Sequence, residues 1–249
     1  MKKLPWYLLL ILFWEAAVKI SGVSPLLVPA VEDVLRALAR DLTQGDLIRQ
    51  SALSVGMIAG GIAVSFVLSL ILAYLSQMHP ALNGFIGTVT DIAHPLPGLA
   101  LMPLILLWFG VGDGAVFAVI VHAAVWPLLL NLNAGTLAVP AVYTETASML
   151  SMSKSGIFFR IRLPYALPYV IAGLKTGWAR AWRALISAEM VFGAIGLHGG
   201  LGTYIMVKRT FMDTAGLFAG ILVIVMIGIL VENGLFRFLE RAALDRWEV

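Results

Sequence analysis

The sequence predicts an all-α, polytopic membrane protein with about six transmembrane helices, and three observations support this. Hydrophobic residues make up 60% of the 249 residues and charged residues only 12%. Soluble domains contain about 45–50% apolar and about 25% charged residues, and disordered chains are poorer still in apolar residues. The apolar residues form long runs, and a bilayer core about 30 Å thick needs roughly 20 apolar residues per helix.

Composition also limits the chemistry of the chain. Cysteine is absent, which excludes disulfides, thiolate metal sites and cysteine nucleophiles. The formal net charge is only +3 and the basic residues are dispersed, so we expect no nucleic-acid partner. The four histidines lack ligand spacing, and we expect neither a metal nor a cofactor on this chain.

Turn and charge signals divide the apolar runs into six predicted spans. The first, Pro5 to Ile20, follows Lys2 and Lys3 without a small-residue cleavage site, so we expect a retained helix rather than a signal peptide. The segment 22–50 is charged and amphipathic, which indicates an external loop with a short surface helix. The other predicted spans cover residues 51–76, 85–109, 115–132, 168–194 and 215–236.

Two features refine these spans. Pro95, Pro97 and Pro103 lie inside the third span, and because proline removes a backbone donor we expect that span to be kinked or broken. Basic residues beside the spans favour cytoplasmic termini, which also puts the loop 133–164 in the cytoplasm. The basic residues on that side are Lys2, Lys3, Lys154, Arg160, Arg162, Lys175, Arg237, Arg241 and Arg246.

The loop 133–164 is hydrophilic overall, yet its pattern is helical. Residues 145–150 predict a short helix with Thr144 as its cap, residues 151–153 a break, and residues 154–163 a second short helix. Their apolar side chains must be covered. Either these helices fold back on the bundle, or they dock into a groove on a soluble partner.

A motif in this loop carries a family resemblance. Glu145-Thr146-Ala147 is followed after three residues by Ser151, and after nine more by Ile161-Arg162-Leu163-Pro164. This spacing resembles the EAA loop of ABC importer permeases: Glu-Ala-Ala, three residues, Gly, nine residues, Ile-x-Leu-Pro. Thr146 and Ser151 depart from the pattern. Residues 97–112 and 173–190 are similar to the nitrate, sulfonate and taurine branch of these permeases.

The resemblance implies a single transmembrane permease domain over residues 1–249, with core helices at 51–236 and a cytoplasmic coupling loop at 133–164, between the fourth and fifth helices. It implies a non-enzymatic subunit in the bacterial inner membrane that conducts a small anionic solute, such as a sulfonate, nitrate or a taurine-like compound. The implied partners are ABC ATPase subunits that hold ATP and Mg, an extracytoplasmic substrate-binding protein, a second permease copy and the lipid bilayer.

The same resemblance assigns residues to ATPase coupling. If Ser151 adopts a positive φ where the family has glycine, the cost is about 1 kcal/mol. The residues expected to couple the permease to the ATPase are Glu145, Thr146, Ala147, Ser151, Ile161, Leu163 and Pro164.

Polar residues within the spans suggest a path for the solute. Arg180, Arg183 and Ser187 share one face of the fifth helix, and Glu189 lies nearly opposite Arg180. Arginines facing water would favour an anion; alternatively, they bind acids or carbonyls of adjacent helices and brace the bundle. The candidates for the translocation path are His94, Asn131, Arg180, Arg183 and Ser187.

A glycine-rich stretch, 196–202, precedes the last span. The family comparison suggests an outer gate that includes Gly199, Gly202 and Tyr204, and the alternative is a flexible turn.

Two other functional classes stay open at this stage. A secondary transporter could use Glu189 or Asp91 as an ion site, although no inverted repeat is detected. An intramembrane hydrolase could pair a serine with His94 or His122, although no nucleophile motif supports it. The phosphate-binding pattern Gly-x4-Gly-Lys-Ser/Thr occurs nowhere, so energy must come from another chain or from an ion gradient.

Overall fold

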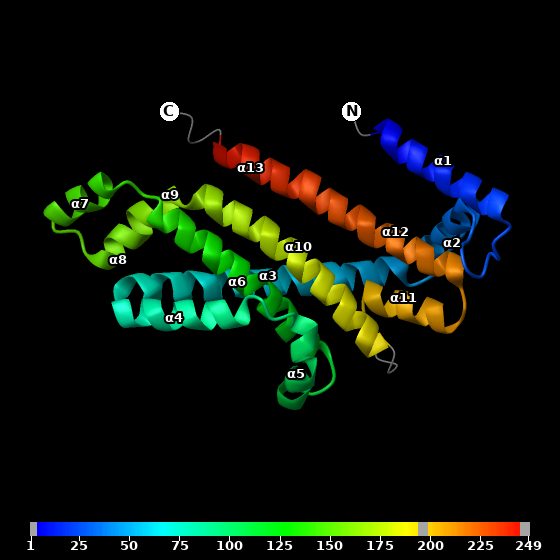
Figure 1. Cartoon of the computed structure of the whole chain (residues 1–249), viewed down its shortest axis with the longest axis horizontal. Helices are drawn as coiled ribbons and strands as arrows, with labels where there is room; N and C mark the ends of the chain where they lie inside the picture. Colours follow the sequence, from blue (N-terminus) through cyan, green and yellow to red (C-terminus); the bar gives the residue numbers. More distant parts are fainter. Residues whose placement is uncertain (1–3, 194–198, 245–249) are drawn as a thin grey trace. The chain divides into compact units, whose positions relative to one another are not determined.

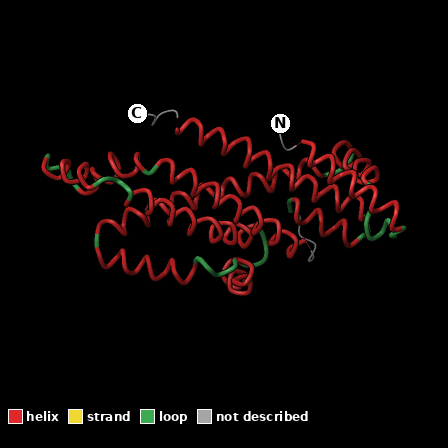
Figure 2. Tube along the Cα trace, turned by 45° about the horizontal axis from the view of Figure 1, so that its top comes forward, coloured by secondary structure: helices red, strands yellow, loops and turns green. Residues whose placement is uncertain are grey.

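The computed structural model describes residues 4–193 and 199–244, and every regular element within these ranges is a helix (Figure 2). The all-α prediction is confirmed. The elements, labelled in Figure 1 where there is room, are α1 Leu4–Ser21, α2 Val31–Thr43, α3 Leu47–Met78, α4 Pro80–Ala93, η1 Gly98–Leu101, α5 Met102–Phe109, α6 Asp113–Leu137, α7 Ala141–Met149, α8 Lys154–Ile157, η2 Phe158–Arg162, α9 Leu163–Tyr165, α10 Leu167–Gly193, α11 Leu201–Thr210, α12 Thr214–Leu230, η3 Val231–Phe236 and α13 Arg237–Leu244.

The described residues hold three to five candidate membrane spans. Leu47–Met78, Asp113–Leu137 and Thr214–Ala242 are each long and apolar enough to cross a membrane. Two bent pairs, α4 with Gly98–Phe109 and Lys154–Tyr165 with Leu167–Phe192, would each add one span. The sequence predicted about six. The difference is the predicted first span, now α1, whose 18 residues include Glu15 and Lys19 and which is not among these candidates.

The third predicted span is broken at its prolines, as expected. The helices on the two sides of the break meet at 94°, and Figure 1 shows α5 turning away from α4. Pro97, with φ −65°, sits at the N-cap of the short helix η1. The span also begins earlier than predicted, at Pro80 rather than Phe85, because His79 caps α4 by accepting the Ala81 N–H at 3.2 Å.

The chain divides into two compact units: residues 1–55 with 186–227 (unit 1) and residues 56–185 with 228–249 (unit 2). The core of unit 2 lies among α3, α4, α6, η2 and α10, with α4 running alongside the C-terminal part of α3 (Figure 1). Its buried side chains are Ala73, Ile86, Leu129, Leu132, Phe158, Ala166 and Val170.

Glycines allow α6 and α10 to approach each other closely in unit 2. A Cβ atom at Gly135 would lie 2.7 Å from Cβ of Tyr169 and 2.8 Å from Cβ of Ala166. A Cβ atom at Gly173 would lie 2.9 Å from Cβ of Asn131. Small residues at such positions are typical of helix contacts in membranes, where close packing replaces the hydrophobic driving force.

In unit 1, α2 is the surface helix predicted within 22–50. Its buried side chains Val34 and Ala37 form a cluster with Ala219 of α12, and Trp14 and Phe218 pack against this cluster. The rings of Trp14 and Phe218 lie 5.4 Å apart. The polar face of α2 stays outside the cluster, which is the arrangement that an amphipathic pattern predicts.

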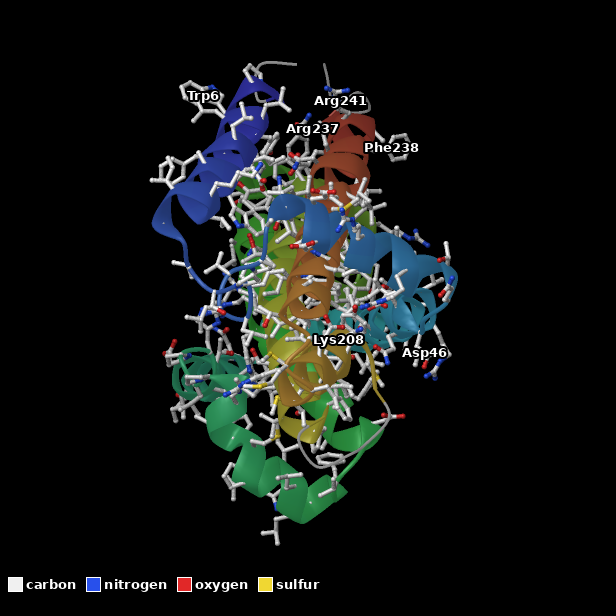
Figure 3. All side chains as sticks on the ribbon, turned by 90° about the vertical axis from the view of Figure 1, so that its right-hand side faces the viewer. Trp6, Asp46, Lys208, Arg237, Phe238 and Arg241 are labelled. Carbon is white, nitrogen blue, oxygen red and sulfur yellow. The ribbon has the colours of Figure 1, made fainter. Side chains whose placement is uncertain are left out.

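The Glu15 carboxylate forms an ion pair within α1 and a hydrogen bond to the start of α2. Glu15 lies 2.8 Å from Lys19, the neutralising pair that their i,i+4 spacing favours. The same carboxylate accepts the Val31 N–H at 3.0 Å. Most of α1 beyond this pair exposes apolar side chains, including Trp6, which is 66% exposed (Figure 3), and a helix in contact with lipid tolerates such exposure.

We predict that Gly135→Ala destabilises the protein by about 1–3 kcal/mol, because the added methyl group must displace atoms close to the backbone of Ala166 and Tyr169. The measurement is the thermal unfolding midpoint of the protein purified in detergent. Gly84→Ala in α4 is the matched control, because a Cβ atom there meets nothing within 4 Å and alanine favours helix. Equal midpoints for the two variants would contradict the close packing of α6 against α10.

Candidate functional site

The loop between α6 and α10 forms two short helices separated by a break, as predicted. The second helix, α8, begins after Ser153, whose hydroxyl accepts the Gly156 N–H at 3.1 Å. The prediction that Thr144 caps the first helix is wrong. Pro140, with φ −56°, occupies the cap position, and Thr144 lies inside α7, where its hydroxyl donates to the Ala141 carbonyl at 3.0 Å.

Ser151 ends α7 in a left-handed conformation. Its φ is +59°, in the region that glycine usually occupies at helix C-termini. The Met152 N–H donates to the Ala147 carbonyl at 3.0 Å, and the Ser151 N–H donates to the Ser148 carbonyl at 3.0 Å. Serine replaces the family's glycine at this position, where a left-handed conformation costs a residue with a Cβ atom about 1 kcal/mol relative to glycine. The turn forms nevertheless.

The two short helices differ in what covers them. Phe158, directly after α8, is 1% exposed and lies edge-on to the ring of Tyr74 at 5.3 Å. The Tyr74 hydroxyl shares a 2.7 Å hydrogen bond with Ser155. Met149 and Leu150, at the end of α7, are 84% and 77% exposed. The second helix thus folds back onto α3, whereas the end of α7 stays uncovered.

A cavity of about 460 Å³ separates α7 from α8 and the end of α3, and Glu145, Lys154 and Arg162 are among its lining residues. Arg162 also donates to Gln77 at 2.6 Å. The motif residues differ in exposure: Ala147 is buried, Ile161 and Leu163 are half-buried, and Glu145, Thr146, Ser151 and Pro164 are exposed.

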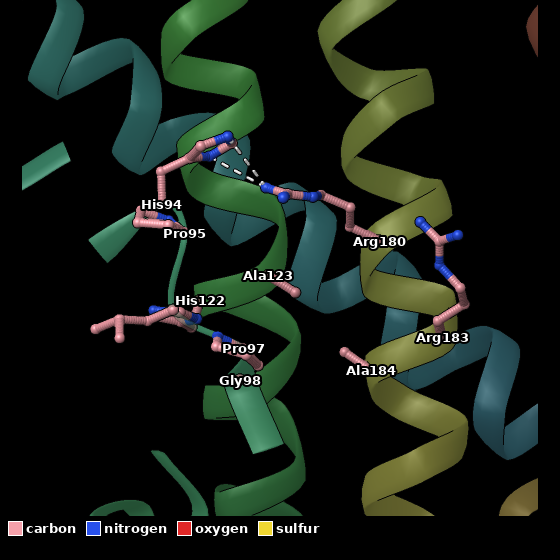
Figure 4. A pocket seen from close by; sticks show the side chains of 10 residues that line it. His94, Pro95, Pro97, Gly98, His122, Ala123, Arg180, Arg183 and Ala184 are labelled. Atoms are coloured by element: carbon pink, nitrogen blue, oxygen red, sulfur yellow. Dashed lines mark hydrogen bonds between the residues drawn. The ribbon is translucent and has the colours of Figure 1, made fainter. Parts of the chain in front are cut away.

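A second pocket in unit 2, of about 280 Å³, gathers polar side chains from three elements (Figure 4). The broken segment after α4 contributes His94, α6 contributes His122, and α10 contributes Arg180 and Arg183. His94, Arg180 and Arg183 are three of the five residues predicted for the translocation path, so the fold brings together side chains that lie far apart in the sequence.

Arg180 extends from α10 toward His94, as Figure 4 shows. Its Nη1 atom lies 3.1 Å from Nδ1 and 3.4 Å from Nε2 of the imidazole. Because a guanidinium only donates, a ring nitrogen of His94 must accept. No acid is among the described residues that line the pocket, and Arg183 has no hydrogen bond or ion pair within the described part of the chain. The arginines are therefore not braced by acids or carbonyls there.

The other two predicted path residues lie outside this lining. The Asn131 side-chain amide donates to the Pro127 carbonyl of its own helix at 2.8 Å, and Ser187 is half-buried on α10. His122, a weaker candidate from its sequence position, lines the pocket instead. No local signal distinguishes it from a packed histidine, because its orientation depends on how the α4–α5 break lies against α6.

Glu189 is buried in unit 1 at the N-terminus of α11. The Ser54 hydroxyl lies 2.9 Å from both carboxylate oxygens of Glu189 and accepts the Leu201 N–H at 2.9 Å. The Gly202 N–H donates to Glu189 at 2.9 Å. Two of the backbone donors that a helix start leaves unpaired are thus satisfied, one by the Ser54 hydroxyl and one by the Glu189 carboxylate, whose charge also complements the helix dipole.

The residues predicted for an outer gate surround this helix start. Residues 194–198, which include part of the predicted glycine-rich gate, lie outside the described residues; Gly199 is half-exposed. Gly202 lies within α11, where a Cβ atom would come 2.3 Å from the Ile186 carbonyl oxygen. Tyr204 is buried, and its hydroxyl donates to Asp41 at 2.5 Å.

Asp41 anchors a charged cluster between α2 and α11. Lys208, labelled in Figure 3, lies 2.6 Å from Asp41 and 2.8 Å from Asp213. Arg40 lies 2.7 Å from Asp41 and 2.9 Å from Asp213. Burial alone would raise the pKa of Asp41, but hydrogen bonds from Arg40, Lys208 and Tyr204 hold it well below its usual range. Burial and the bond to Asp41 raise the pKa of Tyr204.

The described residues contain no group of three or more His, Cys, Asp or Glu side chains that could hold a metal. Fold and pockets together define a helical membrane protein with a polar pocket among its helices. Residues 65–244 match the family described as binding-protein-dependent transport system inner membrane component, and the chain belongs to that family. It is therefore a multi-pass inner-membrane permease subunit of an ABC importer, as the sequence predicted.

Individual relatives agree with this assignment. The taurine transport system permease protein TauC of Escherichia coli is 28% identical over 237 residues, which cover 93% of this chain and 84% of TauC. The bicarbonate transport system permease protein CmpB of Synechococcus elongatus is 29% identical over 198 residues, 80% of this chain and 68% of CmpB. In fold, a chain of the inward-facing MetNI methionine ABC transporter matches with a TM-score of 0.65 at 18% identity, over 82% of this chain and 98% of that one.

We predict that Asp41→Asn destabilises the protein by about 1–3 kcal/mol at neutral pH, because buried donors lose a charged acceptor. The folded-state pKa of Asp41 is lowered, so its stabilisation is fully present above the unfolded-state pKa of about 3.9 and is lost as the pH falls below it. The difference from wild type should stay constant from about pH 8 to pH 5 and shrink below about pH 4.

The measurement is the unfolding midpoint in detergent across this pH range. Asp33→Asn is the control, because the Asp33 side chain forms an exposed pair with Arg36, at 3.4 Å, and exposed pairs contribute little. Equal midpoints for wild type and Asp41→Asn at neutral pH would show that the cluster does not stabilise the fold.

Proposed function

We propose that this chain forms the translocation path of an importer for a small anionic solute, and that the pocket of His94, Arg180 and Arg183 is part of that path. The observation that carries this proposal is that two guanidinium groups share one pocket, with no acid among the described residues that line it. Charges among membrane helices are costly unless paired or hydrated, and arginine suits oxyanions in charge and geometry. The named cargoes of TauC and CmpB, taurine and bicarbonate, carry oxyanion groups.

Separate ATPase subunits, holding ATP and Mg, supply the energy in this proposal. They dock on α7, where Glu145, Met149 and Leu150 are exposed and fit the helix-in-groove mode of recognition. The packing of Phe158 against Tyr74 would transmit movement of the loop to α3. An extracytoplasmic binding protein delivers the solute, as the family description implies, and a second, identical permease copy completes the path.

The loop 133–164 and both termini face the cytoplasm in this proposal. Lys175, early in α10, pairs with Glu240 of α13 at 2.7 Å, which supports placing the C-terminal helix at the same end of unit 2 as the loop. Arg237 and Arg241 of α13 (Figure 3) add to the basic residues expected on the cytoplasmic side. The start of α11, with Gly199, Gly202 and Tyr204, then forms part of an outer gate.

An ion-coupled mechanism is less well supported than ATP coupling. Glu189, its main candidate carboxylate, accepts hydrogen bonds from Ser54 and from the start of α11, which are structural contacts. Asp91 is exposed on α4, outside the lining of the pocket that holds His94, Arg180 and Arg183.

We predict that Glu145→Ala weakens association with the ATPase subunit by about tenfold, because truncating one partner of an interfacial charge pair costs at least that much. The measurements are co-purification and ATP-driven uptake in proteoliposomes, with membrane insertion unchanged. Asp113→Ala, which removes an exposed acid outside the loop, is the control and should behave as wild type. Undiminished association of the Glu145 variant would remove this residue from the docking surface.

We predict that Arg183→Ala lowers uptake several-fold while ATPase assembly persists, because Arg183 has no structural partner among the described residues and its charge serves the solute. Arg183→Lys should recover part of the uptake by restoring the charge without the planar donors. Arg49→Ala, whose exposed arginine pairs with Asp46 at 3.2 Å, is the control. Transport unaffected by Arg183→Ala would show that this arginine does not face the path.

A further inference from the structure

The contact between His94 and Arg180 joins two elements of unit 2. His94 lies at the C-cap of α4, where its backbone N–H donates to the Thr90 carbonyl at 2.8 Å, directly before the broken segment. Arg180 reaches it from α10, with Nη1 3.1 Å from Nδ1 of the imidazole (Figure 4). The bond therefore ties the start of the break to α10.

The backbone after His94 is fixed from the opposite side, by α6. A Cβ atom at Gly98 would lie 3.2 Å from Cγ1 of Val119 on α6, so the segment lies close against that helix. Pro97, with φ −65°, restricts the backbone in between. The place of the imidazole is thus set by the backbone, whereas Arg180 extends a long side chain with many rotamers. His94 is the fixed partner, and it determines where the guanidinium points.

The bond requires a neutral imidazole. A guanidinium stays charged and only donates, and a protonated imidazole also only donates. Protonation of His94 would remove the acceptor and place two cations in contact. The C-terminal end of a helix attracts one positive charge, and at the end of α4 Arg180 already supplies it. A proton on His94 and the Arg180 guanidinium therefore compete for the same place.

The other charges around this imidazole do not offset a proton on it. Arg183 lines the same pocket from α10 and adds a second positive charge, and α6 contributes His122. Asp91, three residues earlier on α4, is exposed and forms no ion pair within the described part of the chain. Residues 56–78 of α3 and the segment 98–109 contain no charged residue.

We propose that neutral His94 is a positioning residue that holds Arg180 in the pocket, and that protonation of His94 releases the guanidinium. The inference rests on the proposed function, in which Arg180 is presented to an anionic solute. Release leaves the pocket without one of its two placed cations and frees the broken segment from α10, so uptake falls in acidic solution. His94 acts through Arg180 rather than on the solute.

The first test is a double-mutant cycle with His94→Phe and Arg180→Met, measured as the unfolding midpoint of the full-length chain in detergent. Contacting residues are not additive, so at pH 8 the double variant should lose a few degrees less than the two single variants together. At pH 5, well below the ordinary histidine pKa of about 6.5, this difference should vanish or change sign. His94→Leu replaces the Phe variant if the larger ring prevents folding.

Tyr74→Phe with Ser155→Ala is the matched control pair for this cycle. The two hydroxyls share a hydrogen bond of 2.7 Å within unit 2, and neither group titrates between pH 8 and pH 5. Its departure from additivity should therefore be the same at both pH values.

The second test is ATP-driven uptake by the assembled importer in proteoliposomes, with radiolabelled taurine, nitrate and bicarbonate as probes. His94→Asn keeps an acceptor at the place of Nδ1 but does not titrate, so it should approach wild-type uptake at pH 8, whereas His94→Phe should lower it several-fold. Between pH 8 and pH 5 the ratio of wild-type to His94→Asn uptake should fall about tenfold. Titration of the ATPase and of His122 cancels in this ratio.

Three results would overturn the inference: additive variants at pH 8, the same departure from additivity at pH 8 and pH 5, or parallel pH profiles of uptake in wild type and His94→Asn. Uptake that rises in acid in wild type alone would also refute it, because charged His94 would then bind the solute itself.

Failure of the proposed function gives a different pattern. Uptake that is lost in Arg183→Ala, with parallel profiles for wild type and His94→Asn, would refute only the role of His94. Uptake indifferent to both Arg183→Ala and Arg180→Met, with the coupling of His94 to Arg180 intact at pH 8, would refute the proposed path instead.

Discussion

Lipid does not solvate polar groups, so a charge among membrane helices needs either a partner within the protein or access to water. This constraint explains the two polar arrangements built around α10. In unit 1, Glu189 accepts hydrogen bonds from Ser54 and from the first turn of α11, so its charge helps to fix a helix start. In unit 2, Arg180 reaches an imidazole instead of an acid, and its positive charge stays available to a ligand.

The same constraint divides the loop between α6 and α10. Its second helix buries Phe158 against Tyr74 and bonds Ser155 to the Tyr74 hydroxyl, so it is packed into unit 2. Its first helix ends in exposed Met149 and Leu150 and in the left-handed residue Ser151. In the proposed coupling to ATPase subunits, the exposed end of α7 would contact the partner, and the second helix, packed on α3, would pass its movement to the rest of unit 2.

Local signals in the sequence predicted much of this fold. Apolar runs located the helices, prolines located the 94° break, and the loop motif located two short helices and the residue with positive φ. Thr144 was misassigned as a cap, because the proline four residues earlier already starts the helix. Contacts between distant residues could not be predicted in this way. Asp41 meets Tyr204 across 163 positions, whereas the pattern of residues 22–50 indicated only a charged external loop.

The same limit explains which path residues were found. Arg180 and His94 were predicted separately, since each is a polar residue in an apolar span, but their meeting depends on the direction in which the broken segment after α4 returns toward α10. Asn131 has the same polarity, yet it bonds its own helix. A polar residue within an apolar span is therefore a candidate for the translocation path, and the group that it bonds in the fold decides whether it is available to a solute. A side chain such as Asn131, which hydrogen-bonds the backbone of its own helix, has a structural role. An arginine such as Arg180, which bonds an imidazole rather than a carboxylate, can still bind an anion.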